Sequence, residues 1–149
     1  GSSILKGSFD KKVTKKIYVH EKLKKNISYV KKTNKKIKFL KRLDHNVSEM
    51  DLIIICTHMS QYSIIIKKLQ KFVSSKNIIT DIGSTNRNII DIINKNNKIK
   101  DIFIPSHPIA GSEVSGPKYG NKNLFKNKWC IIIDNGNKKK LKKVEIFWK

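Results

Sequence analysis

The feature that most constrains the fold of this chain is an alternation of short apolar runs with longer amphipathic stretches. The run DLIIIC at 51–56 is apolar on both faces, as a central strand of a parallel sheet should be. Similar short runs lie at 17–19, 77–81, 102–104 and 129–133. Apolar residues recur at helical spacing over 60–73 and 86–94. Strands that alternate with helices predict βαβ units, and therefore an α/β chain with a doubly wound, mostly parallel sheet.

The rest of the 149-residue chain is less regular. Charge dominates residues 22–46, where we expect one helix and a short strand near 37–40. Residues 1–6 have the pattern of a helix start with no strand before it, and residues 144–149 stop within an amphipathic helix. A doubly wound sheet that lacks its first strand would expose apolar surface. We therefore expect residues 1–149 to form one domain that is truncated at both ends and belongs to a longer protein.

The charge of the chain is strongly positive, with 33 Lys and Arg against 11 Asp and Glu. Such a balance is typical of proteins that bind nucleic acid or anionic lipid. However, the lysines are spread over nearly the whole length and accompany an excess of Ile and Asn, which AT-rich codons produce whatever the function. The aromatic residues are few and do not alternate with basic ones as a stacking surface would need. We expect no nucleic-acid partner; a nucleic-acid-binding module would reveal itself by salt-dependent binding.

Cysteine usage and hydropathy bear on the compartment. Cys56 and Cys130 each lie in an apolar run, and their spacing suits neither a zinc site nor a disulfide framework. A reducing cytoplasm is the natural compartment for such a chain. No run approaches the roughly 20 apolar residues that a membrane helix needs, so we expect no membrane partner and no metal.

The N-terminal region carries the residues expected to bind a cofactor. Gly1 suits the last glycine of the dinucleotide-binding fingerprint, and Ser2 opens the helix whose N-terminus would face a pyrophosphate. Glu21 follows the strand at 17–19; an acid there hydrogen-bonds the ribose hydroxyls and repels a 2′-phosphate, which favours NAD over NADP. The other glycines of the fingerprint are missing, and a solvated glutamate explains Glu21 equally well. On the first interpretation the chain is a partial, Rossmann-like dinucleotide-binding domain.

Two strand ends follow that could line the same cofactor site. After the strand at 51–56, the Thr57 hydroxyl could face the cofactor, while His58 either contacts the cofactor or is a loop residue. After the strand at 77–81, Gly83 permits a tight turn. Ser84 either caps the next helix or touches a ligand, and the two roles are compatible.

The third strand end, SHPIAGSE at 106–113, is the richest in reactive groups. We interpret it as a loop that follows the strand at 102–104. In an α/β domain, ligands bind outside the carboxyl ends of the strands. His107 is therefore placed for acid–base chemistry near neutral pH. The alternative is a capped turn with a surface histidine.

With these three strand ends in this order, the chain resembles the prephenate/arogenate dehydrogenase family of tyrosine biosynthesis. The resemblance rests on the segments at 51–57, 80–85, 106–113, 115–116 and 123–125, of which 106–113 is the most specific. It extends over essentially the whole chain. It implies the NAD-dependent (or NADP-dependent) oxidative decarboxylation of prephenate to 4-hydroxyphenylpyruvate, with arogenate as the alternative substrate.

The resemblance also implies roles for individual residues. His107 matches the catalytic histidine that draws the proton off the ring hydroxyl, while hydride leaves the same carbon for the nicotinamide. Ser84 matches a position that contacts substrate, and Ser112 and Glu113 match positions that line the substrate pocket. His58 and Asn86 depart from the family, which usually has Pro and commonly has Lys there.

The family also has a C-terminal helical domain that forms the homodimer and supplies an arginine for the substrate. No such domain follows Lys149 in this sequence. We therefore expect this polypeptide alone to be inactive and the full-length protein to be a homodimer. The alternative is an inactive remnant that keeps the fold.

Overall fold

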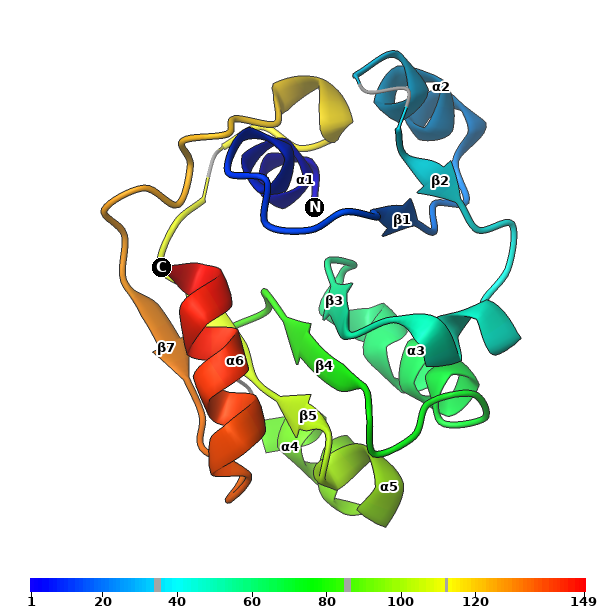
Figure 1. Ribbon diagram of the computed structural model, residues 1–149, viewed down its shortest axis with the longest axis vertical. Coiled ribbons are helices and arrows are strands. Elements are labelled where there is room, and N and C mark those ends of the chain that lie inside the picture. Colours follow the sequence, from blue (N-terminus) through cyan, green and yellow to red (C-terminus); the bar gives the residue numbers. More distant parts are fainter. Residues whose placement is uncertain (34–35, 85–86, 112) are drawn as a thin grey trace. The chain divides into compact units, whose positions relative to one another are not determined.

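The computed structural model describes residues 1–33, 36–84, 87–111 and 113–149. The chain forms two compact units, each built from two separate segments (Figure 1). Unit 1 comprises residues 1–43 and 110–128, and unit 2 comprises residues 44–109 and 129–149.

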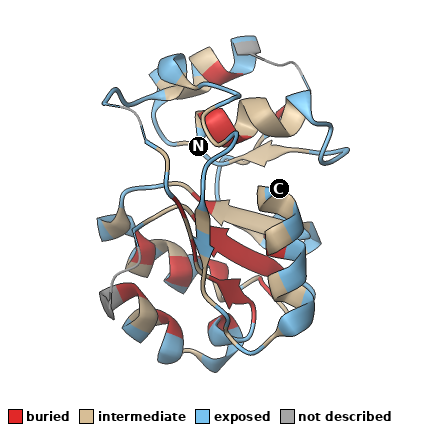
Figure 2. Ribbon diagram, turned by 90° about the vertical axis from the view of Figure 1, so that its left-hand side faces the viewer, coloured by how far each residue is buried: buried red, intermediate tan, exposed pale blue. Residues whose placement is uncertain are grey.

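Unit 2 is organised around a parallel sheet with the strand order β3-β4-β5. The strands are β3 (Leu52–Ile55), β4 (Ile78–Asp81) and β5 (Phe103–Ile104). The helical elements between them are η2 (Met59–Gln61), α3 (Tyr62–Leu69), α4 (Arg87–Asn94) and α5 (Asn97–Lys100). The predicted alternation of strands and helices is therefore confirmed for this part of the chain. All four residues of β4 are buried, as the central strand requires (Figure 2).

A second sheet of unit 2 corrects the prediction for the segment around His107. Ser106–Pro108 is not a loop but a strand, β6, and it pairs antiparallel with β7 (Cys130–Ile132). The predicted strand at 129–133 is thus present, but it runs opposite to its neighbour. Main-chain hydrogen bonds extend the pair on both sides, from Ile109 N–H to Trp129 O at 2.7 Å and from Ile133 N–H to Pro105 O at 3.0 Å.

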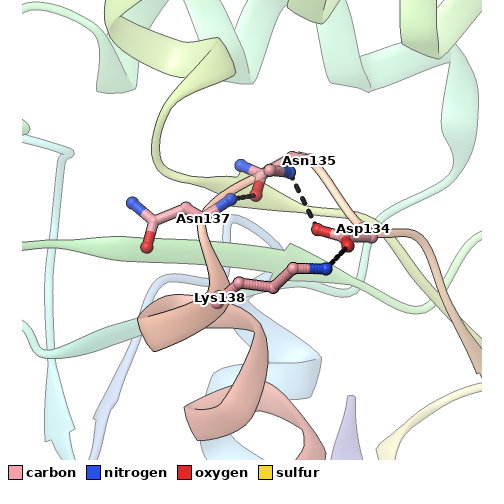
Figure 3. Close-up of polar contacts among 5 residues, drawn as sticks. Asp134, Asn135, Asn137 and Lys138 are labelled. Atoms are coloured by element: carbon pink, nitrogen blue, oxygen red, sulfur yellow. Dashed lines mark hydrogen bonds and ion pairs between the residues drawn. The ribbon is translucent and has the colours of Figure 1, made fainter.

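The helix α6 (Lys138–Trp148) packs against β5 and β7 and begins at a tightly bonded turn (Figure 3). Asp134 accepts a hydrogen bond from Gly136 N–H and pairs with Lys138, while Asn135 Oδ1 accepts from Asn137 N–H at 3.0 Å. The Asn135 amide also donates to the main-chain oxygens of Lys100 and Phe103, at 2.9 and 3.1 Å. These bonds fix the start of α6 to the strand β5.

The apolar side of α6 completes a buried cluster. Ile78, Ile104 and Val144 are its fully covered members, and Leu52, Ile132, Leu141 and Trp148 pack around them. Burial of one such aliphatic side chain stabilises a fold by about 1.5–3 kcal/mol. The cluster therefore holds α6, and with it Trp148, on the sheet.

Unit 1 contains a short parallel pair of strands and two helices. The elements are α1 (Ser2–Asp10), β1 (Tyr18–Val19), α2 (Lys24–Thr33), β2 (Lys38–Phe39) and η3 (Pro117–Tyr119). β1 and β2 pair in parallel, with Tyr18 opposite Lys38. The helix and short strand expected within residues 22–46 are confirmed. No helix of the described residues is long and apolar enough to cross a bilayer.

A buried asparagine connects the first strands of unit 2. Asn77, which precedes β4, is fully buried, and its amide donates to Met50 O at 2.6 Å and Ser48 O at 3.2 Å. Its Oδ1 accepts from Ser74 N–H at 2.7 Å. The side chain thus satisfies carbonyls at the end of the turn η1 (His45–Glu49), just before β3 begins.

Replacing Asn77 with alanine should lower the free energy of unfolding by about 2–3 kcal/mol, because several buried main-chain groups lose their partner. Urea denaturation of the variant measures this loss. Asn94→Ala is the matched control: Asn94 is exposed in α4, and the change should alter stability by less than about 0.5 kcal/mol. Equal effects of the two substitutions would contradict the structural role of Asn77.

Candidate active site

The carboxylate of Asp81, the last residue of β4, is the centre of a hydrogen-bond network in unit 2. Asp81 is buried, and its Oδ1 accepts a hydrogen bond from Ser106 N–H at 3.0 Å. Its Oδ2 accepts from the Tyr62 hydroxyl at 3.1 Å and from Gly83 N–H at 3.2 Å. One side chain therefore joins the end of β4, the start of α3 and the start of β6.

Burial dominates the electrostatics of this network. It raises the pKa of Asp81 above its usual value, although hydrogen bonds from Ser106, Tyr62 and Gly83 and the charge of His107 act in the opposite direction. Burial, together with the neighbouring Asp81, likewise raises the pKa of Tyr62. Both groups thus hold their protons more tightly than they would in water.

The hydroxyl of Ser106 is the centre of a second group of hydrogen bonds, next to the Asp81 carboxylate. It donates to Asp81 O at 2.6 Å and accepts from Trp148 Nε1 at 3.1 Å. It also lies 2.9 Å from Thr80 Oγ1. Ser106 is therefore fixed by the end of β4 and by the C-terminal end of α6, so the first residue of β6 has little freedom to move.

His107 follows Ser106 on β6 and lies opposite Ile131 of β7. Because side chains alternate along a strand, the imidazole lies on the other face of β6 from the Ser106 hydroxyl. The residue is partly exposed, yet its Nδ1 is buried and forms no hydrogen bond with any described residue. Leaving a buried polar atom without a partner is costly and uncommon in native proteins, so this atom needs a physical reason.

Gly83 is required by close packing. A Cβ atom at this position would lie 2.8 Å from the Tyr62 hydroxyl and 3.2 Å from Asp81 Oδ2. The next residue, Ser84, is exposed, with its Oγ 3.3 Å from the sulfur of Met59. The turn after β4 thus presents Ser84 at the surface, where a ligand can reach it.

The end of β3 lies in the same unit. Thr57 is exposed. His58 is exposed as well and caps η2: its Nδ1 accepts from Ser60 N–H at 3.4 Å and lies 3.0 Å from Ser60 Oγ. The structure therefore gives His58 a local capping role, and contact with a cofactor stays a prediction for both residues.

Unit 1 holds the residues predicted to bind the adenosine end of a dinucleotide. Gly1 is the N-cap of α1 and supplies no side-chain cap, while Ser2 is the first helical residue. Glu21 follows β1 and accepts hydrogen bonds from the N–H groups of Lys22 and Leu23, at 2.7 and 2.9 Å, and from the Asn26 amide at 3.1 Å. Partial burial would raise the pKa of Glu21, but these hydrogen bonds and the charge of His20 outweigh it and lower the pKa.

The predicted substrate residues of the following loop are only partly described. Glu113 is exposed and belongs to the segment 110–128 of unit 1. Ser112 and Asn86 lie outside the described residues.

Sequence reasoning gave no role to five residues of the network, Tyr62, Thr80, Asp81, Ser106 and Trp148, although Ser106 lies within the motif. A carboxylate at the end of a buried strand, as in Asp81, is the signal that could have revealed the site.

The cysteines have no part in this chemistry. Cys56 and Cys130 are free thiols, and burial raises the pKa of both, that of Cys130 to about 11. Neither is therefore a thiolate at neutral pH. The described residues also contain no group of three or more His, Cys, Asp or Glu side chains that could hold a metal ion.

Comparison with known proteins gives one family. The family described as "Prephenate dehydrogenase, nucleotide-binding domain" matches residues 9–149. Cyclohexadienyl dehydrogenase of Zymomonas mobilis is 32% identical over 91 residues, which are 61% of this chain and 31% of that protein. Prephenate dehydrogenase of Lactococcus lactis is 33% identical over 90 residues, 58% of this chain and 25% of that protein.

Solved structures agree with the sequence comparison. The crystal structure of prephenate dehydrogenase from Aquifex aeolicus, in complex with hydroxyphenyl propionate and NAD+, matches with a TM-score of 0.86 and 26% identity. The match covers 99% of this chain and 52% of that one, so the chain spans about half the length of this relative. The predicted Rossmann-like α/β fold is thereby confirmed.

The raised pKa of Asp81 predicts a pH-dependent stability. The folded protein binds the Asp81 proton more tightly than the unfolded chain does, so protonation stabilises the fold. This contribution is fully present below the ordinary aspartate pKa of 3.8 and is lost as the pH rises through the higher folded-state value. Across that interval the wild type should lose stability relative to Asp81→Asn, which has no proton to release. Urea denaturation of both proteins over a pH series measures the difference; a difference independent of pH would contradict the assignment.

Proposed function

Because this chain belongs to the family of the prephenate dehydrogenase nucleotide-binding domain, we propose that its protein catalyses the NAD-dependent oxidative decarboxylation of prephenate to 4-hydroxyphenylpyruvate, a step of tyrosine biosynthesis. The observation that carries the proposal is the placement of His107. It lies within the segment that the family matches, on a strand fixed by Asp81, and its buried Nδ1 has no partner among the described residues.

His107 is the base in this proposal. A neutral imidazole accepts a proton readily near pH 7, and a positioned base of this kind contributes about 10²–10⁴-fold in rate. It accepts the proton of the ring hydroxyl, which lets electrons flow toward the carbon that loses hydride. Carbon dioxide then leaves and the ring becomes aromatic.

Asp81 and Ser106 act as positioning residues for that base. They hold the first residue of β6 through the N–H and Oγ of Ser106. Ser84, Ser112 and Glu113 are the proposed substrate contacts. The side chains of Ser84 and Glu113 are exposed and so are accessible to a small molecule.

The N-terminus of α1 fits the pyrophosphate of NAD. The first N–H groups of a helix have no partner within it, and Gly1 supplies no side-chain cap for them. Such groups bind anions. Glu21 fits the adenosine ribose, because its lowered pKa keeps it ionised and able to repel the 2′-phosphate of NADP. Thr57, His58 and Gly83 are the proposed cofactor contacts of unit 2, and NAD, when bound, accepts the hydride.

Arogenate is the second candidate substrate. The match to a cyclohexadienyl dehydrogenase favours this alternative, because the two acids share the cyclohexadienol ring and differ only in the keto or amino group of the side chain. His107 would have the same role with either. We also propose a homodimeric, cytoplasmic protein; the two free thiols are compatible with a reducing compartment.

Replacing His107 with asparagine should lower kcat by about 10²–10⁴-fold, because the base is lost, while the Kd for NAD stays unchanged. Steady-state assays of the full-length protein with prephenate and with arogenate measure the first quantity, and calorimetric titration with NAD measures the second. His45→Asn, at an exposed histidine of η1, is the matched control. Unchanged turnover in His107→Asn would remove His107 from catalysis, and a wild type without turnover on either acid would support an inactive remnant.

Replacing Glu21 with glutamine should lower the preference for NAD over NADP by about tenfold, because the repulsion of the 2′-phosphate disappears. Glutamine keeps one oxygen acceptor for the N–H groups of Lys22 and Leu23, so the local fold should survive. The ratio of kcat/KM for the two cofactors is the measurement. An unaltered ratio would place Glu21 outside the cofactor site.

A further inference from the structure

Gly120 lies in unit 1 at a contact that only glycine allows. A Cβ atom there would lie 2.5 Å from Ser2 Oγ, 2.8 Å from Ser2 Cβ and 3.0 Å from the Ser2 carbonyl carbon. The hydroxyl could rotate away, but the Cβ and the carbonyl carbon belong to the first turn of α1 and move only with it. The backbone of Gly120, with φ −58° and ψ 129°, is one that any residue adopts. The glycine is therefore needed for space and not for conformation.

The residues around Gly120 hold α1 along its length. We call residues 117–122 the α1 strap. Lys6 Nζ donates to Gly120 O at 2.7 Å, and Asn121 N–H donates to Ser3 Oγ at 3.0 Å. Lys122 pairs with Asp10 at 2.7 Å, although both side chains are half-exposed and the pair adds little stability.

The strap is also fixed to the second helix of the unit. The Tyr29 hydroxyl of α2 donates to Lys118 O at 3.3 Å. The strap therefore has a contact that does not depend on α1, and it can fix the position of the first turn of α1.

We propose that Gly120 is a positioning residue for NAD: by lacking a side chain, it lets the strap hold the first turn of α1 where its N–H groups bind the pyrophosphate. This inference rests on the proposed cofactor site. Hydrogen bonds from main-chain N–H groups depend steeply on distance and angle, so a small displacement of this turn weakens anion binding.

The test is Gly120→Ala in the full-length protein. The Kd for NAD, measured by calorimetry, should rise about tenfold, while kcat at saturating NAD stays within about twofold of wild type. A second readout needs no cofactor. Leu5 N–H donates to Gly1 O at 3.0 Å, the first hydrogen bond of α1, and its hydrogen exchange should become faster in the variant.

Removing the opposing side chain should reduce both effects. In a Ser2→Gly background the contacts at 2.5 and 2.8 Å no longer exist and only the 3.0 Å approach to the main-chain carbonyl carbon of residue 2 remains, so adding Gly120→Ala should change the Kd and the Leu5 exchange by clearly less than it does in the wild type. Gly7→Ala is the matched control, because its added methyl group would lie at an ordinary 3.4 Å from Lys122 O in the same interface.

The outcomes separate this inference from the proposed function. An unchanged Leu5 exchange and Kd in Gly120→Ala, or an equal loss in the Ser2→Gly background, would overturn the role of Gly120. Faster Leu5 exchange with an unchanged Kd for NAD would overturn its connection to the cofactor. A wild type that binds no NAD, measured in the same titration, would overturn the proposed cofactor and this role together.

Discussion

The bonds between Asp81 and Ser106 hold together the part of the molecule on which the candidate chemistry depends. β5 is only two residues long, and the chain turns directly from it into the antiparallel pair β6–β7. A short strand offers few ladder hydrogen bonds, so the register of β6 needs support from elsewhere. Asp81 supplies it by binding both the N–H and the hydroxyl of Ser106. The next residue in the chain is His107.

This support carries an electrostatic cost. A buried carboxyl group is less stable in its charged form, and here burial outweighs the hydrogen bonds it receives and the neighbouring charge of His107. Groups of this kind are common at active sites, where a fixed geometry is worth more than the lost stability. Trp148 adds to the rigidity from the far end of α6 by donating to Ser106 Oγ.

The sequence predicted the elements whose signal is local and missed those that depend on distant partners. The strands β3 and β4 and the helix α3 follow from apolar periodicity within a few residues. The strand β6 does not, because Ser106, His107 and Pro108 have no strand-like pattern and are ordered by β7, more than twenty residues later. The role of Asp81 was missed for the same reason. Its hydrogen bond to Tyr62 joins the end of a strand to a helix whose sequence has an ordinary amphipathic pattern. His107 was found through its motif, while the groups that fix its strand were not.

Unit 1 is built from two segments that lie far apart in the sequence, and this affects the order in which its parts can fold. The hydrogen bond between Ser3 and Asn121 spans 118 residues. The antiparallel pair that carries His107 ends at the hydrogen bond between Ile109 and Trp129. The segment between these two residues, 110–128, belongs to unit 1 and contacts α1. During synthesis, α1 is made before unit 2 and must wait for the strap, which emerges only after most of unit 2. Contacts of such long range slow folding and leave the early segment exposed. The helix α1 is therefore without its tertiary partner while most of unit 2 is being made.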